Sequence, residues 1–424
     1  MELLEKILER GNLNEAYKRV YANKGASGVD GVTVEELLSY LKDHKAELLE
    51  SIRTRKYKPQ PVKRVEIPKE SGGKRPLGIP TVVDRVIQQA TVQVLSPIYE
   101  EQFSNSSYGF RVGRSCEQAV IRSLELINDG WDWIVDIDLE RFFDTVHHDR
   151  LMNIISRTVT DGDVISLIRK FLVSGVMVNG SYEDTTIGTP QGGNLSPLLA
   201  NIMLNELDKE LEARELNFVR YADDCNIFVR SEKAADRVMK SVTDFIERKL
   251  GLKVNVTKSR IGRPTDIKFL GFGYFNGTDG RVHAKPHAKS ILKLKRKLKA
   301  LTKRSWAISL DIRLAKLKQL IVGWINYFRI SRMKTAMSEL DKHLRKRIRV
   351  VIWKQWKKIR TRYEGLRKLG IGHGEAFRVA NSRLSYQHIC GINTLHVALT
   401  NKRLMQRGLL SLTDHFNKVH LVTN

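Results

Sequence analysis

Two adjacent carboxylates, Asp223 and Asp224, lie between two short runs, residues 217–220 and 225–229, that are rich in Val, Ile and Phe. Apolar runs on either side of a polar pair predict a β-hairpin with the two acids at its turn. The turn contains no glycine, and two neighbouring negative charges repel each other, so the pair does not stabilise the turn. Mg²⁺ would remove the repulsion, because it prefers oxygen ligands. We therefore favour a metal site over the alternative, an acidic turn in solvent.

A second pair of acids interrupts an apolar strand earlier in the chain, at residues 133–138. A strand has a period of two residues, so Asp136 and Asp138 share one face and Ile137 lies on the other. Buried strands rarely carry acids for structural reasons alone. Either acid is therefore a candidate metal ligand.

A basic hairpin could hold phosphate. Residues 62–69 and 74–79 alternate as strands do and place Lys69 and Arg75 on the two arms. The planar fork of Arg and the point charge of Lys suit the oxygens of a triphosphate. An exposed basic hairpin without a ligand is the alternative.

A glycine-rich loop, residues 188–197, ends in Ser196 and Pro197, an N-cap and first-turn pair that predicts the start of a helix. Glycines before a helix N-terminus let a phosphate or a base pair approach the backbone closely. Two histidines, His147 and His148, also stand where a helix should begin. There we expect polar caps or phosphate contacts rather than metal ligands.

The composition points to a polyanionic partner. The 424 residues include 73 Lys and Arg against 47 Asp and Glu, a formal net charge of +26. No apolar run reaches the roughly 18 residues that cross a bilayer, so no membrane is expected. Three scattered cysteines, Cys116, Cys225 and Cys390, predict neither a disulfide framework nor a zinc site. The N-terminus has no secretory apolar core, and we expect a reducing, intracellular location.

The pattern of apolar residues predicts an α+β sheet domain followed by helices. Helices are expected at residues 1–22, 34–49, 148–159, from 196 onward and 234–250, with extended segments at 254–259 and 268–273. From residue 286 the chain is helical and basic, with three apolar stripes that predict a three-helix bundle. The stripes are Ile291, Leu294, Leu298 and Leu301; Leu314, Leu317, Ile321, Trp324 and Phe328; and Leu340, Leu344, Ile348 and Val351. The aromatic residues, Tyr327 among them, are expected to pack in the core.

Together these motifs resemble a reverse transcriptase, and in particular the bacterial group II intron-encoded reverse transcriptase/maturases. The resemblance rests on residues 137–144 (IDLERFFD), 189–193 (TPQGG) and 221–224 (YADD), with 269–272 similar to a primer grip and 323–328 to the maturase thumb. It implies a right-hand polymerase. Its domains would be fingers and palm with an N-terminal extension (1–285), a helical thumb or maturase X domain (286–360) and a basic DNA-binding domain (361–424). Cys390 is the only cysteine in the last third, so a short form without the endonuclease domain is expected.

The resemblance also implies roles for single residues. Asp138, Asp223 and Asp224 would hold two Mg²⁺ ions, for which Mn²⁺ could substitute. Ile137 and Leu139 would lie at the same metal site. Asp138 is preferred to Asp136 because the family's sugar-checking aromatic lies five residues after its metal-binding Asp, which is Phe143 here.

The remaining implied roles concern the substrate and nucleic acid. Lys258 would protonate the leaving pyrophosphate. Lys69, Arg75, Phe143, Gln191, Gly192 and Tyr221 would contact the incoming dNTP or the nascent pair. A further set of cations would bind nucleic acid: Arg53, Arg55, Lys56, Arg64, Lys293, Arg296, Lys297 and Lys299. For the first basic run, residues 53–58, a solvated face is the alternative, and the interleaved Tyr57 modestly favours nucleic-acid binding.

The function implied is RNA-directed DNA polymerisation by two-metal nucleotidyl transfer, together with binding of intron RNA to assist splicing and mobility. The expected partners are an RNA template with a DNA primer, group II intron RNA, target DNA and dNTPs, in the bacterial cytoplasm; protein partners are not predicted. Alternatives are a catalytically silent RNA-binding splicing factor, or a retron or diversity-generating reverse transcriptase. An RNA-dependent RNA polymerase would need a smaller residue at Phe143.

Overall fold

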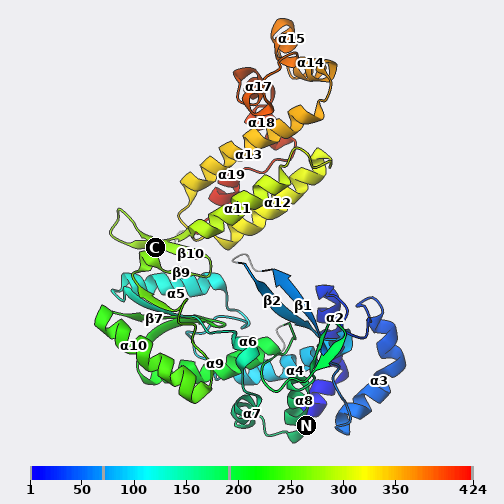
Figure 1. The fold of residues 1–424 in the computed structure, drawn as a ribbon, viewed down its shortest axis with the longest axis vertical. Helices are drawn as coiled ribbons and strands as arrows, with labels where there is room; N and C mark the ends of the chain where they lie inside the picture. Colours follow the sequence, from blue (N-terminus) through cyan, green and yellow to red (C-terminus); the bar gives the residue numbers. More distant parts are fainter. Residues whose placement is uncertain (1, 69–71, 190–191, 422–424) are drawn as a thin grey trace. The chain divides into compact units, whose positions relative to one another are not determined.

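The computed structural model describes residues 2–68, 72–189 and 192–421 (Figure 1). The chain divides into two compact units, Met1–Arg263 and Pro264–Asn424. The β-hairpin that follows residue 268 therefore belongs to the same compact unit as the C-terminal helices. The expected domain boundaries at residues 285 and 360 stay predictions.

The first unit is rich in helices. They are α1 (Leu3–Leu8), α2 (Arg10–Asn23), α3 (Leu37–Arg53), α4 (Val82–Glu100), α5 (Cys116–Asn128), α6 (Phe142–Thr145), α7 (His148–Ser156), α8 (Gly162–Leu172), α9 (Ser196–Ala213) and α10 (Glu232–Phe245), the last continued by the π-helical turn η1 (Ile246–Leu250). The expected single N-terminal helix is wrong, because Glu9 leaves the helical region with ψ 139° and separates α1 from α2. Ser196 is the first residue of α9 rather than its N-cap, which is Leu195.

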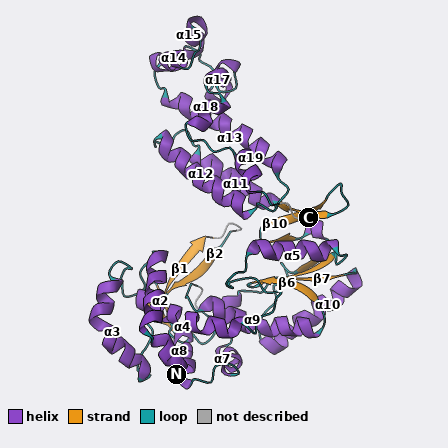
Figure 2. Cartoon of the chain, turned by 180° about the vertical axis from the view of Figure 1, so that it is seen from behind, coloured by secondary structure: helices purple, strands orange, loops and turns teal. Residues whose placement is uncertain are grey.

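An antiparallel sheet of four strands lies at the centre of this unit, in the order β6-β7-β3-β8. The strands are β3 (Trp133–Ile137), β6 (Asn217–Tyr221), β7 (Asp224–Val229) and β8 (Arg260–Gly262). One face carries Val135, Ile137 and Ile227, which are buried in the main hydrophobic core. Across the other face Asp136 stands opposite both Asn226 of β7 and Arg260 of β8. Helices α5 and α10 lie on opposite sides of the sheet in both views (Figure 2). The strand at residues 133–138 and the hairpin around the acids are confirmed.

Two local predictions on this sheet are wrong. Tyr221 pairs with Asp224, so the turn is Ala222-Asp223 and Asp224 already belongs to β7. Ala222 adopts a left-handed φ of 57°, which a non-glycine residue takes up only under constraint from its surroundings. Residues 254–259 form mainly turns, and the strand begins only at Arg260.

A second sheet, in the order β2-β1-β4-β5, lies in the same unit. It consists of β1 (Val62–Pro68), β2 (Lys74–Ile79), β4 (Val176–Val178) and β5 (Ser181–Glu183). The predicted basic hairpin β1–β2 is confirmed, with Ile67 opposite Arg75. Both Arg64 and Arg75 are exposed.

The second unit begins with the short 3-10 helix η2 (Pro264–Asp266). A small sheet, β11-β10-β9, follows, made of β9 (Lys268–Phe269), β10 (Phe272–Asn276) and β11 (Val282–Pro286). Helices α11 (Ala288–Leu301), α12 (Leu310–Tyr327) and α13 (Lys334–Gln355) follow and lie side by side (Figures 1 and 2). The remaining helices are α14 (Ile359–Lys368), α15 (His373–Ala380), α16 (Tyr386–Ile389), α17 (Asn393–Ala398), α18 (Asn401–Gln406) and α19 (Leu412–Val419). The predicted three-helix bundle is confirmed, because Leu294, Ile321 and Leu344 are all buried. The expectation that Tyr327 packs in the core is wrong, because this side chain is 44% exposed. None of the helices that the structure describes is both long and apolar enough to span a membrane.

Candidate active site

The acids of β3 and of the β6–β7 turn meet at one end of the central sheet. The pairing of β3 with β7 runs to Ile137 opposite Cys225, so Asp138 follows directly on one strand and Asp224 precedes on the other. The pKa of Asp223 is raised, chiefly by burial and then by the negative charge of Asp138. Carboxylates 85 residues apart in the chain (138 to 223) are thus electrostatic neighbours.

The segment before β8 fixes Asp138 from the other side. The backbone N–H of Asp138 donates to Ser259 Oγ at 3.0 Å, and the N–H of Asn255 donates to the Asp138 carbonyl at 2.8 Å. Lys258 Nζ donates to the carboxylate of Asp138, 3.2 Å from Oδ1. The charges of Arg75 and Lys258 both lower the pKa of Asp223, so two cations lie within electrostatic reach of the acids.

Asp136 has a different environment. Arg260 Nε donates to its carboxylate at 3.4 Å, and burial raises the pKa of Asp136 to about 6. Both acids are ion-paired, Asp136 with Arg260 and Asp138 with Lys258, but Asp136 lies within β3 on the sheet face, whereas Asp138 lies past the end of β3, next to the acidic turn. This difference favours Asp138 over Asp136 as the ligand.

The donor set fits a hard divalent cation. It consists of carboxylate oxygens, which Mg²⁺ prefers, and the mutual repulsion of Asp138 and Asp223 would be relieved by a positive ion. The side chains of Ile137 and Leu139 are buried and apolar, so only their backbone carbonyls could be ligands. Within residues 2–68, 72–189 and 192–421, no group of three or more His, Cys, Asp or Glu side chains is arranged to hold a metal by itself.

Phe143 lies on the short helix α6, directly after this site in the chain. Arg141 takes a left-handed φ of 47° and starts α6, which buries Phe142 and leaves Phe143 partly exposed against it, with the ring centroids 5.2 Å apart. The carbonyl of Phe143 accepts from the N–H of Thr189 at 2.6 Å. The glycine-rich loop is therefore tied to the residue that is expected to sense the sugar.

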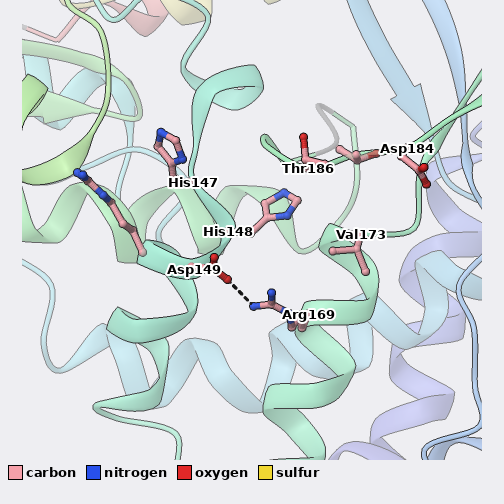
Figure 3. A pocket seen from close by; sticks show the side chains of 9 residues that line it. His147, His148, Asp149, Arg169, Val173, Asp184 and Thr186 are labelled. Atoms are coloured by element: carbon pink, nitrogen blue, oxygen red, sulfur yellow. Dashed lines mark hydrogen bonds and ion pairs between the residues drawn. The ribbon is translucent and has the colours of Figure 1, made fainter.

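His148 supports the same loop. Its ring is buried, and Nε2 lies 2.6 Å from the carbonyl of Gly188. His147 precedes α7 without a side-chain capping bond. A pocket of about 630 Å³ beside them contains both acids and bases, and Asp149 pairs there with Arg169 at 2.8 Å (Figure 3). The expected caps and phosphate contacts are thus replaced, for His148, by a structural bond to the loop.

Gly192 lies close to the basic hairpin. A Cβ at this position would be 2.5 Å from the carbonyl of Gly78 in β2, and Gly192 has a φ of +127°. Only glycine permits this approach. Lys69 and Gln191 lie outside the described residues.

The first basic run is mostly engaged within the protein. Arg53 forms a bidentate pair with Glu5, at 2.8 and 2.9 Å, and Arg55 pairs with Asp163. Tyr57, interpreted from the sequence as a nucleic-acid contact, instead donates its hydroxyl to the carboxylate of Asp84. Other predicted nucleic-acid contacts are exposed: Lys56, Arg64, Lys293, Arg296, Lys297 and Lys299.

Sequence reasoning missed one buried charge beside the acidic turn, that of Arg220. Its guanidinium is 1% exposed and donates to the carbonyl of Ala222 at 2.9 Å. The signal was visible in the chain, because an Arg in the middle of an apolar strand must find a partner when it is buried.

Comparison with protein families matches residues 67–274 to the reverse transcriptase (RNA-dependent DNA polymerase) model. The chain belongs to the reverse transcriptases, a class that generally uses divalent metal ions. Residues 291–370 match the group II intron maturase-specific domain, so within this class it belongs to the group II intron-encoded proteins. The two domains imply nucleic acid such as RNA as a partner.

Three relatives illustrate the family. Protein YkfC of Escherichia coli is 34% identical over 63% of this chain and 81% of its own length. The group II intron-encoded protein LtrA of Lactococcus lactis is 40% identical over 48% of this chain, and the match spans about a third (34%) of LtrA. The putative COX1/OXI3 intron 2 protein of Saccharomyces cerevisiae is 30% identical over 61% of this chain and 37% of its own length.

Proposed function

We propose that this protein is an active RNA-directed DNA polymerase encoded by a group II intron, which synthesises cDNA in the bacterial cytoplasm and binds the intron RNA to assist splicing and mobility. The observation that carries the proposal is the meeting of Asp138 with Asp223, next to the cations of Lys258 and Arg75. Acids from two separate strands that converge beside cations suit phosphoryl transfer, in which positioning and charge stabilisation supply most of the rate.

In the proposed reaction, Asp138 and Asp223 would hold two Mg²⁺ ions, with Asp224 as the adjoining acid. Such ions would supply charge stabilisation for the attacking 3′-hydroxyl and the leaving phosphate oxygen. Arg75 neutralises the triphosphate, together with Lys69.

Two further residues act on the substrate in this proposal. Phe143 excludes the 2′-hydroxyl of a ribonucleotide by contact with the sugar. Lys258, whose ammonium lies 3.2 Å from Asp138, gives a proton to the pyrophosphate as it leaves. Gly192, Gln191 and Tyr221 complete the surface behind the nascent base pair.

The polymerase half is tested by replacing Asp223 and Asp224 with Ala and measuring primer extension on an RNA template. We expect extension to be abolished while RNA binding stays close to that of the wild type. The double variant Asp236→Ala/Asp244→Ala is the matched control, because both acids are exposed on α10, away from the turn. Undiminished cDNA synthesis by the Asp223/Asp224 variant would remove the polymerase proposal.

The maturase half is tested by reversing charge along α11, with Lys293, Lys297 and Lys299 changed to Glu. We expect weaker binding of group II intron RNA and less splicing assistance, because phosphate contacts dominate such binding. Reversal of Lys42 and Lys45, both exposed on α3 in the first unit, is the control. Unchanged affinity and splicing in the α11 variant would refute this half alone.

A further inference from the structure

A strongly basic pocket lies in the second unit, next to the C-terminal end of α11. It has a volume of about 580 Å³, within the range of ligand sites. Three segments form it: the loop after α11, the middle of α13 and the start of α16. The lining residues are Thr302, Lys303, Arg304, His343, Lys346, Arg347, Val350, Ser385, Tyr386 and Gln387. We call it the Tyr386 pocket.

The lining contains four Lys and Arg side chains and no carboxylate. In the part of the chain that the structure describes, Lys303, Arg304, Lys346 and Arg347 form no ion pair. The pKa of His343 is lowered, first by burial and then by Arg347 and two lysines nearby, as expected in a region of positive potential. The free protein therefore concentrates positive charge that nothing in the pocket neutralises.

The cations are held in place by neutral groups. Arg347 donates through Nε to Thr302 Oγ1 at 2.5 Å and through Nη2 to the carbonyl of Lys299 at 3.1 Å. The Arg304 guanidinium lies 5.3 Å from the ring centre of Tyr386, and two further cations, Lys354 and Arg362, lie within 6 Å of the same ring, at 5.4 and 5.9 Å. A ring attracts cations but leaves their charge uncompensated. The arrangement is a preformed set of donors for an anion.

The pocket joins two parts of the chain that the family comparison separates. Arg304 and Lys346 lie in the matched maturase-specific region, residues 291–370, whereas Ser385, Tyr386 and Gln387 follow it. An anion bound here would contact both parts and hold them together.

We propose that the Tyr386 pocket binds a phosphodiester segment of the RNA that this protein recognises. The inference rests on the proposed RNA-binding function and gives it a defined site. The phosphate oxygens accept hydrogen bonds from Lys303, Lys346 and Arg347, which makes the contact independent of base sequence. Because the site reads backbone, its contribution is electrostatic and falls with salt.

The test compares two double variants of the full chain that lose the same charge. Lys303→Gln/Lys346→Gln removes two exposed pocket cations whose side chains make no hydrogen bond in the described structure. Lys368→Gln/Lys402→Gln removes two exposed lysines of the same unit that do not line the pocket. Binding of a fluorescein-labelled RNA stem-loop is measured by anisotropy at several KCl concentrations, and primer extension on a short RNA template checks that each variant is folded.

We expect the pocket variant to bind about tenfold more weakly than the control variant, with a salt slope lower by about 1 to 2, since each lost phosphate contact accounts for roughly 0.7–0.9. Equal affinities and salt slopes for the two variants would overturn the proposal that the Tyr386 pocket binds RNA, but would not contradict the proposed RNA-binding function of the protein. If the wild type itself does not bind the stem-loop, the proposed RNA function fails with it. Inorganic phosphate at constant ionic strength should compete only weakly; strong competition that is lost in the pocket variant would identify free phosphate as the ligand instead.

Discussion

Arg220 and Asp208 form a bidentate ion pair in the interior of the first unit, with their side chains 1% and 0% exposed. Arg220 Nε lies 2.6 Å from Asp208 Oδ1, and Nη2 lies 2.5 Å from Oδ2. The remaining nitrogen, Nη1, donates to Asn201 Oδ1 and to the carbonyl of Ala222, the residue before Asp223. Helix α9, which carries Asp208 and Asn201, thereby holds the acidic turn through one strand side chain.

This relationship predicts two different outcomes for two kinds of substitution. Asp208→Asn leaves a buried guanidinium without its counter-charge, which costs about 3–5 kcal/mol, so the melting temperature should fall sharply. Asp208→Leu with Arg220→Met removes both charges and should keep the fold, since apolar replacement of a buried pair is often tolerated. It also removes the donor to Ala222, so the turn loses its anchor.

For the double variant we expect kcat for primer extension to fall about tenfold or more and the Mg²⁺ concentration at half-maximal rate to rise, while the melting temperature stays near that of the wild type. Calorimetry and steady-state kinetics on one preparation measure both. Wild-type kcat and Mg²⁺ dependence in a folded double variant would show that the pair acts on stability alone.

The backbone of Gly109, in the segment between α4 and α5, lies directly against the same turn. A Cβ there would lie 2.3 Å from the backbone nitrogen of Ala222, and the neighbouring Tyr108 N–H donates to the Arg220 carbonyl at 2.8 Å. Gly109→Ala should therefore displace the turn, lower the free energy of unfolding by about 1–3 kcal/mol and reduce primer extension. Gly374→Ala, in the helix α15 with open space around its Cβ, is the control; it should leave primer extension unchanged and should not lower the free energy of unfolding, because Ala favours the helix over Gly.

Phe143 offers a test of substrate choice rather than of rate. Its ring is partly exposed, and its carbonyl anchors the loop through Thr189, a contact that a change of side chain preserves. Phe143→Ala should therefore keep dNTP incorporation and admit rNTPs, raising their kcat/KM relative to dNTPs by tenfold or more. Single-nucleotide incorporation with matched dNTP and rNTP pairs measures this ratio. An unchanged ratio would place the sugar check on another residue.

The contacts of Asp279 with His283 and Arg332 predict that the stability of the second unit depends on pH. A hydrogen bond with His283, at 2.8 Å, and another from Arg332, at 2.9 Å, hold the pKa of Asp279 below its usual range. A carboxyl whose folded pKa is depressed adds its full stability at pH values above its unfolded pKa of about 4. This stability declines below that value and is lost completely only when the pH has fallen through the lower, folded pKa. Asp279→Asn should thus lower the melting temperature more at pH 7 than at pH 3. Equal losses at both pH values would assign the effect to packing.

Helices and strands whose formation depends on residues close together in the sequence could be predicted from the sequence. The basic hairpin, the acid-bearing strand β3 and the apolar stripes of α11, α12 and α13 follow from periods of two and 3.6 residues, which the chain carries locally. The family, with its acidic motifs, was also recognisable. Boundaries were less accurate, because the left-handed φ of Ala222 and the break at Glu9 depend on contacts outside the local pattern.

Only the tertiary structure decided which distant side chains became partners. Tyr57 bonds to Asp84, Arg220 pairs with Asp208 and Asp136 pairs with Arg260, while Asp138 pairs with Lys258 beside Asp223. No period in the sequence encodes these pairs. Each pair forms when packing brings charged or polar groups together, because burying such a group without a partner costs free energy. The sequence determined which elements form and which residues carry chemistry; the packing of those elements determined which charges face one another.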